Sequence, residues 1–184
     1  MKSDLFNFNN LGIAPKILDI LQEWGFNEPT LIQSKSIPIA IEGKDLVGIA
    51  QTGTGKTLAF GIPMIQRLNQ TGGRGLLLLP TRELASQANA HLRNIGAKFG
   101  LQIAVLIGGE PKRFQLRALK LKPQIIIATP GRLIDHIKNN TIDLKKKSIE
   151  KGIAITTPIR TKTKISREFE KTEANSLSWN FCFT

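Results

Sequence analysis

A glycine-rich segment near residue 50 carries the residue types that bind phosphate, and it reads Ala50-Gln51-Thr52-Gly53-Thr54-Gly55-Lys56-Thr57. Glycines let the backbone turn tightly, so that successive N–H groups face an anion, and the N-terminus of a following helix adds positive charge. Lys56 can reach the β- and γ-phosphates of a nucleotide, and the Thr57 hydroxyl can coordinate Mg²⁺. The segment is typical of a P-loop, although Ala50 stands where the strict motif has glycine. An ordinary Gly/Thr-rich turn is the alternative.

The elements that must position this loop are a strand before it and a helix after it. An apolar run at residues 46–49 precedes the loop, and apolar residues at helical spacing follow it from Leu58 to Ile65. Three further apolar runs, at 76–79, 103–107 and 125–127, alternate with helical patterns. This alternation predicts an α/β fold with a parallel sheet covered on both faces. Pro63 is expected to kink the helix that follows the P-loop.

The loops after these strands should meet, because the carboxyl ends of parallel strands lie at one edge of the sheet, where ligands bind. Besides the P-loop they are Pro80-Thr81-Arg82, Gly108-Gly109 and Thr129-Pro130-Gly131-Arg132. Each offers backbone N–H groups or a guanidinium to phosphate. Thr81 and Thr129 also stand at predicted helix N-caps, so capping alone explains any single loop. Four such loops on one edge of a basic domain favour a nucleic-acid track.

Length and composition fit one domain with a polyanionic partner. The chain has 184 residues and a formal net charge of +12, which favours nucleic acid, with a merely solvated basic surface as the alternative. Cys182 is the only cysteine, so an intrachain disulfide is excluded and a reducing compartment is expected. Without a secretory h-region or a transmembrane-length apolar run, the expected location is the cytoplasm. His91 and His136 are interpreted as solvated or capping side chains rather than metal ligands.

From about Phe8 to Leu144 the sequence resembles the first RecA-like domain of the DEAD-box ATP-dependent RNA helicases. The segment Gly25-Phe26…Pro29-Thr30…Ile32-Gln33, with Phe8 seventeen residues before Gly25, resembles the Q motif of that family. Residues 50–57 resemble motif I, residues 80–85 motif Ia and residues 129–132 motif Ib. The resemblance implies an α/β parallel-sheet P-loop domain of the RecA-like class, and it covers only part of that domain.

The same resemblance assigns the site residues. It implies that Gln33 hydrogen-bonds the adenine edge while Phe8 packs on the ring, so that ATP with Mg²⁺ is the expected ligand. The predicted nucleotide-binding residues are Phe8, Gln33, Gly53, Thr54, Gly55, Lys56 and Thr57, with Thr57 also the predicted metal ligand. The resemblance further implies sequence-independent contacts with the RNA backbone. The predicted RNA-binding residues are Pro80, Thr81, Arg82, Gly108, Gly109, Thr129, Pro130, Gly131 and Arg132.

The sequence departs from the family after residue 144. Where the family continues into an apolar strand that ends in Asp-Glu-Ala-Asp, this chain reads Lys145-Lys146-Lys147-Ser148-Ile149-Glu150. No Ser-Ala-Thr motif follows, and the chain holds no second RecA-like domain. The absent carboxylates would help to hold Mg²⁺ and would orient the attacking water. We therefore expect nucleotide and RNA binding, without hydrolysis or unwinding by this chain alone, and assign no catalytic residue.

The expected domain boundary follows from this departure, with residues 1–144 as the helicase portion and residues 145–184 as a divergent tail. In the family, the strands that carry the absent motifs lie beside the P-loop strand, and their loss would leave its ladder groups unpaired. Residues 152–156 and an alternating apolar pattern at 177–183 are candidate strands to fill the gap. A frameshift, a fusion or a truncated gene is the simpler explanation of the tail. The alternatives to a helicase fragment are a non-enzymatic RNA-binding or interfering module and a non-functional product.

Overall fold

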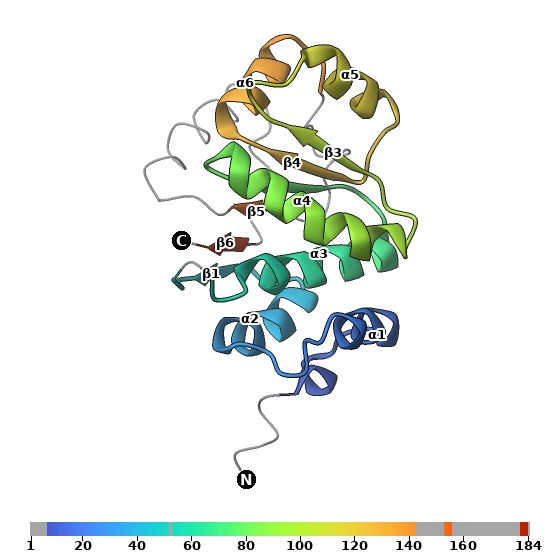
Figure 1. The fold of residues 1–184 in the computed structure, drawn as a ribbon, viewed down its shortest axis with the longest axis vertical. Coiled ribbons are helices and arrows are strands. Elements are labelled where there is room, and N and C mark those ends of the chain that lie inside the picture. The colour runs from blue at the N-terminus through green and yellow to red at the C-terminus, as the bar shows by residue number, and fades with distance from the viewer. Residues whose placement is uncertain (1–6, 52, 143–152, 156–180, 184) are drawn as a thin grey trace.

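The computed structural model describes residues 7–51, 53–142, 153–155 and 181–183, and it contains a parallel six-stranded sheet with the strand order β1-β6-β5-β2-β4-β3 (Figure 1). The strands are β1 (Leu46–Gly48), β2 (Gly75–Leu78), β3 (Ile103–Leu106), β4 (Ile125–Ala128), β5 (Ile153–Ile155) and β6 (Phe181–Phe183). The four strands expected from the apolar runs are present to within one residue at each end. The predicted α/β class with a parallel sheet is confirmed.

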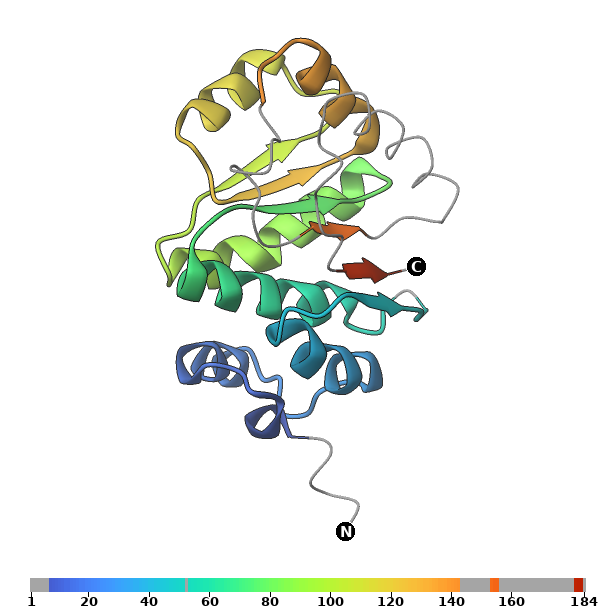
Figure 2. The ribbon, with the colours of Figure 1, turned by 180° about the vertical axis from the view of Figure 1, so that it is seen from behind.

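Helices cover both faces of the sheet. They are the 3₁₀ helix η2 (Phe8–Leu11) and the α-helices α1 (Pro15–Glu23), α2 (Leu31–Ile41), α3 (Lys56–Thr71), α4 (Arg82–Ala97), α5 (Lys112–Lys120) and α6 (Pro130–Lys138). Helices α3 and α4 lie on one face, where Leu77 and Ile127 join their core. On the other face Leu76 and Ile126 pack with residues of α6. Figures 1 and 2 show these two layers from opposite sides.

Neighbouring residues of β2 and β4 therefore belong to different cores, because successive side chains of a strand point to opposite faces. Both strands are buried along their whole length. This explains why they appear in the sequence as continuous apolar runs rather than as alternating patterns. The ladder between β2 and β4, with Gly75 opposite Ile125 and Leu78 opposite Ala128, sets the relative position of the loops that follow them at the carboxyl edge.

The two strands from the tail lie between β1 and β2. Strand β6 pairs with β1 in parallel, Leu46 opposite Phe181, and β5 pairs with β2, Leu76 opposite Ile153. The P-loop strand thus has a ladder partner, which is the alternative that the sequence left open for residues 152–156 and 177–183. Residues 156–180 between the two strands lie outside the described residues.

The N-terminal segment is fixed to the P-loop helix by a buried glutamine. Gln66 of α3 donates through Nε2 to the Gly12 carbonyl at 2.9 Å and accepts at Oε1 from the Ala14 N–H at 2.8 Å. These bonds satisfy two backbone groups between η2 and α1. They place the segment that contains Phe8 against α3. Helix α3 runs from Lys56 to Thr71 without a break at Pro63, the residue at which the sequence predicts a kink.

Candidate nucleotide site and RNA-binding pocket

The P-loop has the backbone conformation that its glycines allow. Gly53 and Gly55 have φ of 81° and 84°, in the left-handed region that other residues rarely adopt. Gly55 is the N-cap of α3, so the first N–H groups of that helix open toward the loop. The ammonium of Lys56 donates to the Ala50 carbonyl at 2.6 Å, which folds its side chain back over the loop. Thr57 lies in the first turn of α3, half-buried, and Thr52 lies outside the described residues.

Gln33 links the N-terminal helices to the P-loop. Its Oε1 accepts from the Thr30 N–H at 2.9 Å, and its Nε2 donates to the Gly55 carbonyl at 3.0 Å. The Thr30 hydroxyl donates to the Thr54 carbonyl at 2.8 Å, so both residues of the α2 capping box hold the loop. A side chain at Gly55 would be strained by the positive φ, and its Cβ would displace Gln33 Nε2 from the loop. A carboxamide nitrogen carries two N–H groups and its oxygen two lone pairs, so Gln33 has unused hydrogen-bonding capacity, although the residue is only 3% exposed.

Phe8 is placed less openly than its predicted role suggests. Its side chain is only 4% exposed and belongs to the core that α1, α2 and α3 share. The stacking of Phe8 on an adenine ring therefore stays a prediction, and it would use the small exposed part of the side chain.

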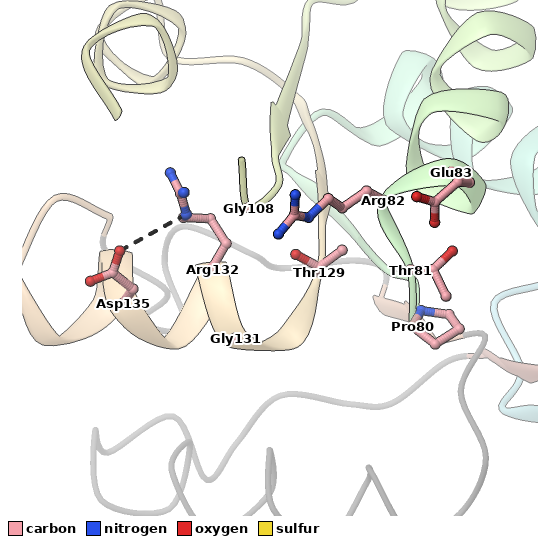
Figure 3. Close-up of a pocket in the computed structure, with 9 residues that line it drawn as sticks. All are labelled: Pro80, Thr81, Arg82, Glu83, Gly108, Thr129, Gly131, Arg132 and Asp135. Atoms are coloured by element: carbon pink, nitrogen blue, oxygen red, sulfur yellow. Dashed lines mark ion pairs between the residues drawn. The ribbon is translucent and has the colours of Figure 1, made fainter. Parts of the chain in front are cut away.

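A pocket of about 650 Å³ lies at the carboxyl edge of β2, β3 and β4 (Figure 3). Its lining contains predicted RNA-binding residues from three separate loops, together with two carboxylates. The lining residues are Pro80, Thr81, Arg82, Glu83, Gly108, Thr129, Gly131, Arg132 and Asp135. Gly109 and Pro130 are also predicted to bind RNA. Each is the chain neighbour of a lining residue, but neither lines the pocket. The parallel sheet therefore brings together three of the four loops that the sequence predicted to meet, and no described residue of the P-loop lines this pocket.

Arg82 extends from the start of α4 across the glycine pair (Figure 3). An added Cβ at Gly108 would lie 3.0 Å from Arg82 Nη2, and one at Gly109, where φ is 83°, would clash with Nη1. The two glycines therefore allow the guanidinium to lie close to the backbone of the loop. Thr81 caps α4 as predicted, accepting from the Leu84 N–H at 3.3 Å. Thr129 is the N-cap residue of α6 as predicted, although its side chain makes no capping hydrogen bond.

Arg132 is held from beneath the pocket by a buried polar network. The Ile107 carbonyl can only accept, so Gln115 turns its Nε2 toward it, at 2.8 Å. Gln115 Oε1 then faces two donors, Arg132 Nη1 at 3.2 Å and His136 Nε2 at 2.9 Å. The other ring nitrogen of His136 lies 2.8 Å from the Thr141 hydroxyl. Gln115 and His136 are each 2% exposed, so the centre of the network is closed to solvent, while Arg132 reaches the pocket.

Asp135 balances the charge of the pocket on its other side. It pairs with Lys112, at 2.7 Å between Oδ2 and Nζ, and lies 4.0 Å from Arg132 Nε. The hydrogen bond from Lys112, together with the nearby cationic charges, holds the pKa of Asp135 below its ordinary value. At neutral pH this carboxylate is ionised and fixes Lys112 beside the second turn of α6.

The interpretation of His136 as a solvated or capping side chain is wrong. Burial, aided by the charge of Arg132, lowers the pKa of His136 below its ordinary value, and Asp135 opposes this only in part. The sequence places His136 three residues after Leu133 on the apolar face of α6. That spacing indicates burial, but nothing in it identifies Gln115 as the partner. Gln115, His136, Glu83 and Asp135 are the residues of this region that sequence reasoning missed.

We expect the lowered pKa of His136 to make the folded chain less stable as the pH falls from about 7.5 to about 5.5. The unfolded histidine takes up a proton near its ordinary pKa of about 6.5, whereas the folded one resists it to a lower pH. The associated stability is therefore present above about pH 6.5 and is lost as the pH falls toward the folded pKa. Urea unfolding at three pH values measures the change. His136→Gln should flatten it and the exposed control His91→Gln should not; equal slopes in all three proteins would contradict the assignment.

The comparisons with known proteins agree with this geometry. The DEAD/DEAH box helicase family model matches residues 30–163, which extends beyond the predicted boundary at residue 144. The DEAD-box ATP-dependent RNA helicase CshA of Geobacillus kaustophilus is 43% identical over 140 residues, which cover 75% of this chain and 30% of that protein. The chain belongs to the DEAD/DEAH box helicase family.

Solved structures of the same class superpose on nearly the whole chain. A DEAD box protein from the hyperthermophile Methanococcus jannaschii matches with a TM-score of 0.79 and 31% identity, over 97% of this chain and 49% of that one. A hypothetical ATP-dependent RNA helicase from Sulfolobus tokodaii matches with a TM-score of 0.76 and 31% identity, over 93% of this chain and 50% of that one. The chain thus spans about half the length of these structures and less of the curated relative. Among the described helices, none is long and apolar enough to cross a membrane.

Proposed function

We propose that this chain is the part of a DEAD-box RNA helicase that binds ATP at the P-loop and the RNA backbone at the carboxyl-edge pocket. The single observation that carries the proposal is the pocket itself. Loops that are distant in sequence, after β2, β3 and β4, converge there with two arginines, at the same edge of the sheet as the P-loop. The family membership supports the same assignment.

The residues of the P-loop fit a nucleotide triphosphate with Mg²⁺. Gly53 and Gly55 hold left-handed backbone that exposes N–H groups, and an added Cβ at Gly53 meets nothing within 4 Å, so the loop is open there. Lys56 would exchange its bond with the Ala50 carbonyl for the phosphates, and Thr57 would coordinate Mg²⁺. The metal supplies charge neutralisation on the phosphates when it is bound. The chain itself holds the triphosphate, orients it at the start of α3 and selects the base through Gln33.

The pocket fits a sugar–phosphate backbone better than it fits bases. Its donors are the guanidinium groups of Arg82 and Arg132 and the hydroxyls of Thr81 and Thr129, which recognise phosphate and sugar oxygens without reading sequence. Binding should be weak, with a dissociation constant on the order of 10⁻⁴–10⁻⁶ M at physiological salt. The contribution of Arg82 and of Arg132 to this affinity should be the same for single strands of unrelated sequence.

Thermal-shift titrations with Mg²⁺-ATP and Mg²⁺-GTP test the nucleotide site. We expect ATP and ADP to stabilise the chain more than GTP, because Gln33 sits where a base edge can be recognised beside the P-loop. Gln33→Ala should reduce the difference between ATP and GTP, while Gln87→Ala, an exposed glutamine on α4, should leave it unchanged. Equal protection by ATP and GTP in the parent chain would contradict the role of Gln33, and no protection by either in a folded chain would remove the site.

A second candidate is a non-enzymatic module that binds RNA or competes with a full-length helicase. The observation that favours it is that no two acidic residues are adjacent anywhere in the chain. The two candidates differ in nucleotide dependence. An RNA affinity that is unaffected by saturating ATP favours the simple module, whereas coupling between the two ligands favours the helicase portion.

A further inference from the structure

Helix α5 carries a basic surface that the proposed function leaves unused. The helix holds four basic residues and no acidic one, and Gln115 is its only fully buried residue. The α5 surface consists of exposed side chains at helical spacing, namely Arg113, Phe114, Arg117 and Lys120. Exposed Lys122 and Leu121 follow directly after the helix. The positive charge of this surface is therefore not neutralised within its own helix.

The α5 surface begins where the pocket ends. The chain enters α5 directly from the Gly108-Gly109 loop, and Gly108 lines the pocket. Lys112, in the first turn of α5, pairs with Asp135, which also lines the pocket. Figure 1 shows α5 beside α6 at the β3 end of the sheet. From Arg113 the surface then extends about 10 Å along the helix to Lys120, at about 1.5 Å per residue.

Its side chains match the two parts of a single-stranded nucleic acid. The guanidinium carbon of Arg113 lies 4.9 Å from the centre of the Phe114 ring, and Phe114 is 50% exposed. An exposed ring offers a face on which a base stacks, and arginines spaced by one turn follow the phosphates. A base that covers the Phe114 ring also removes apolar surface from water, which is favourable.

We propose that the α5 surface binds the single strand of RNA as it leaves the pocket, which lengthens the track beyond the arginines at the sheet edge. The inference rests on the proposed RNA function of the pocket. It assigns Arg113 and Arg117 to phosphates and Phe114 to a base. Short RNA fills the pocket alone, whereas longer RNA occupies both the pocket and the α5 surface.

Fluorescence anisotropy with labelled oligouridylates of about 6 and about 20 nucleotides tests this, because the shorter length is near the lower limit of a single-domain site. The variant is Arg113→Gln combined with Arg117→Gln. The matched control is Arg93→Gln combined with Lys98→Gln, two exposed cations at α4, which covers the opposite face of the sheet. We expect the α5 variant to bind the long RNA about tenfold more weakly, with the salt slope reduced by about 1.4 for two lost phosphate contacts. Its binding of the short RNA, and its melting temperature, should equal those of the control.

Phe114→Leu should weaken binding of the long RNA by a few fold and leave binding of the short RNA unchanged. Phe114→Tyr should bind the long RNA as tightly as the parent chain does. Equal losses on the two lengths, or no loss on the long one, would overturn the α5 assignment. The assignment would also be overturned if the parent chain bound phosphatidylserine vesicles while its affinity for RNA did not depend on RNA length. The pocket is judged separately by the short RNA: if a folded parent chain does not bind it, the proposed function fails, whatever the long RNA shows.

Discussion

The purified 184-residue chain should release phosphate from ATP no faster with RNA than a Lys56→Ala variant does. Hydrolysis in this family of folds requires a carboxylate that orients water and another that helps to hold Mg²⁺, in addition to the P-loop. The glutamates after residue 145 are Glu150, Glu168, Glu170 and Glu173, and none is adjacent to an aspartate. A transition-state arginine, where one is supplied, adds an effect of roughly 10³–10⁵ in rate. Strand separation should be absent for the same reasons.

A coupled assay for phosphate release, with and without single-stranded RNA, measures this outcome. Lys56→Ala is the matched control because it removes the cation that holds the phosphates while leaving the rest of the loop in place. Thermal stabilisation of the parent chain by ATP must be demonstrated in the same preparation, so that an absence of turnover is not mistaken for a failure to bind nucleotide. RNA-stimulated turnover that Lys56→Ala abolishes would show that a carboxylate of residues 143–184 serves as the base, and the prediction would be wrong.

Replacing Arg132 should weaken RNA binding by about 1.5–3 kcal/mol, the range for a charge-assisted hydrogen bond, which corresponds to roughly 10- to 150-fold. Gln115→Leu should reproduce much of that loss, although Gln115 is 2% exposed and touches no ligand. The carboxamide accepts from Arg132 Nη1 at 3.2 Å, and without it the guanidinium keeps only the Glu110 carbonyl at 3.3 Å and Asp135 at 4.0 Å. Because Gln115 acts through Arg132, the double variant that combines Gln115→Leu with Arg132→Ala should bind RNA no more weakly than Arg132→Ala alone.

The fold must be checked independently, because Gln115→Leu also leaves the Ile107 carbonyl and His136 Nε2 without a partner. We expect it to lower the free energy of unfolding by about 2–6 kcal/mol, at about 1–3 kcal/mol for each of the two buried groups. Nucleotide protection then reports whether the rest of the domain is intact at the assay temperature. Arg93→Ala, an exposed arginine on α4, should leave RNA affinity nearly unchanged. Additive losses of RNA affinity in the double variant would show that Gln115 acts independently of Arg132, and the assignment would be wrong.

Local sequence determined the parts of this protein that depend on neighbouring residues. The apolar runs at 76–79 and 125–127 predict buried strands, because a strand covered on both faces must be apolar throughout. The glycines before Lys56 predict a phosphate loop, because few other residues adopt the backbone that they hold. The convergence of the loops at 80–82, 108–109 and 129–132 also follows, since all carboxyl ends of a parallel sheet lie on one edge.

The tertiary structure alone decided the contacts that join segments far apart in the chain. Gln33 packs on Gly55, Gln66 spans Gly12 and Ala14, and Gln115 joins Arg132 to His136. A glutamine on a helix has the same local pattern whether it is solvated or buried, so its partner is fixed only when distant elements meet. The strand order is of the same kind. Strand β6 pairs with β1 although more than a hundred residues separate them. Parallel pairing depends on the crossover connections and on which strand edge remains open. Neither is encoded in a local run of residues.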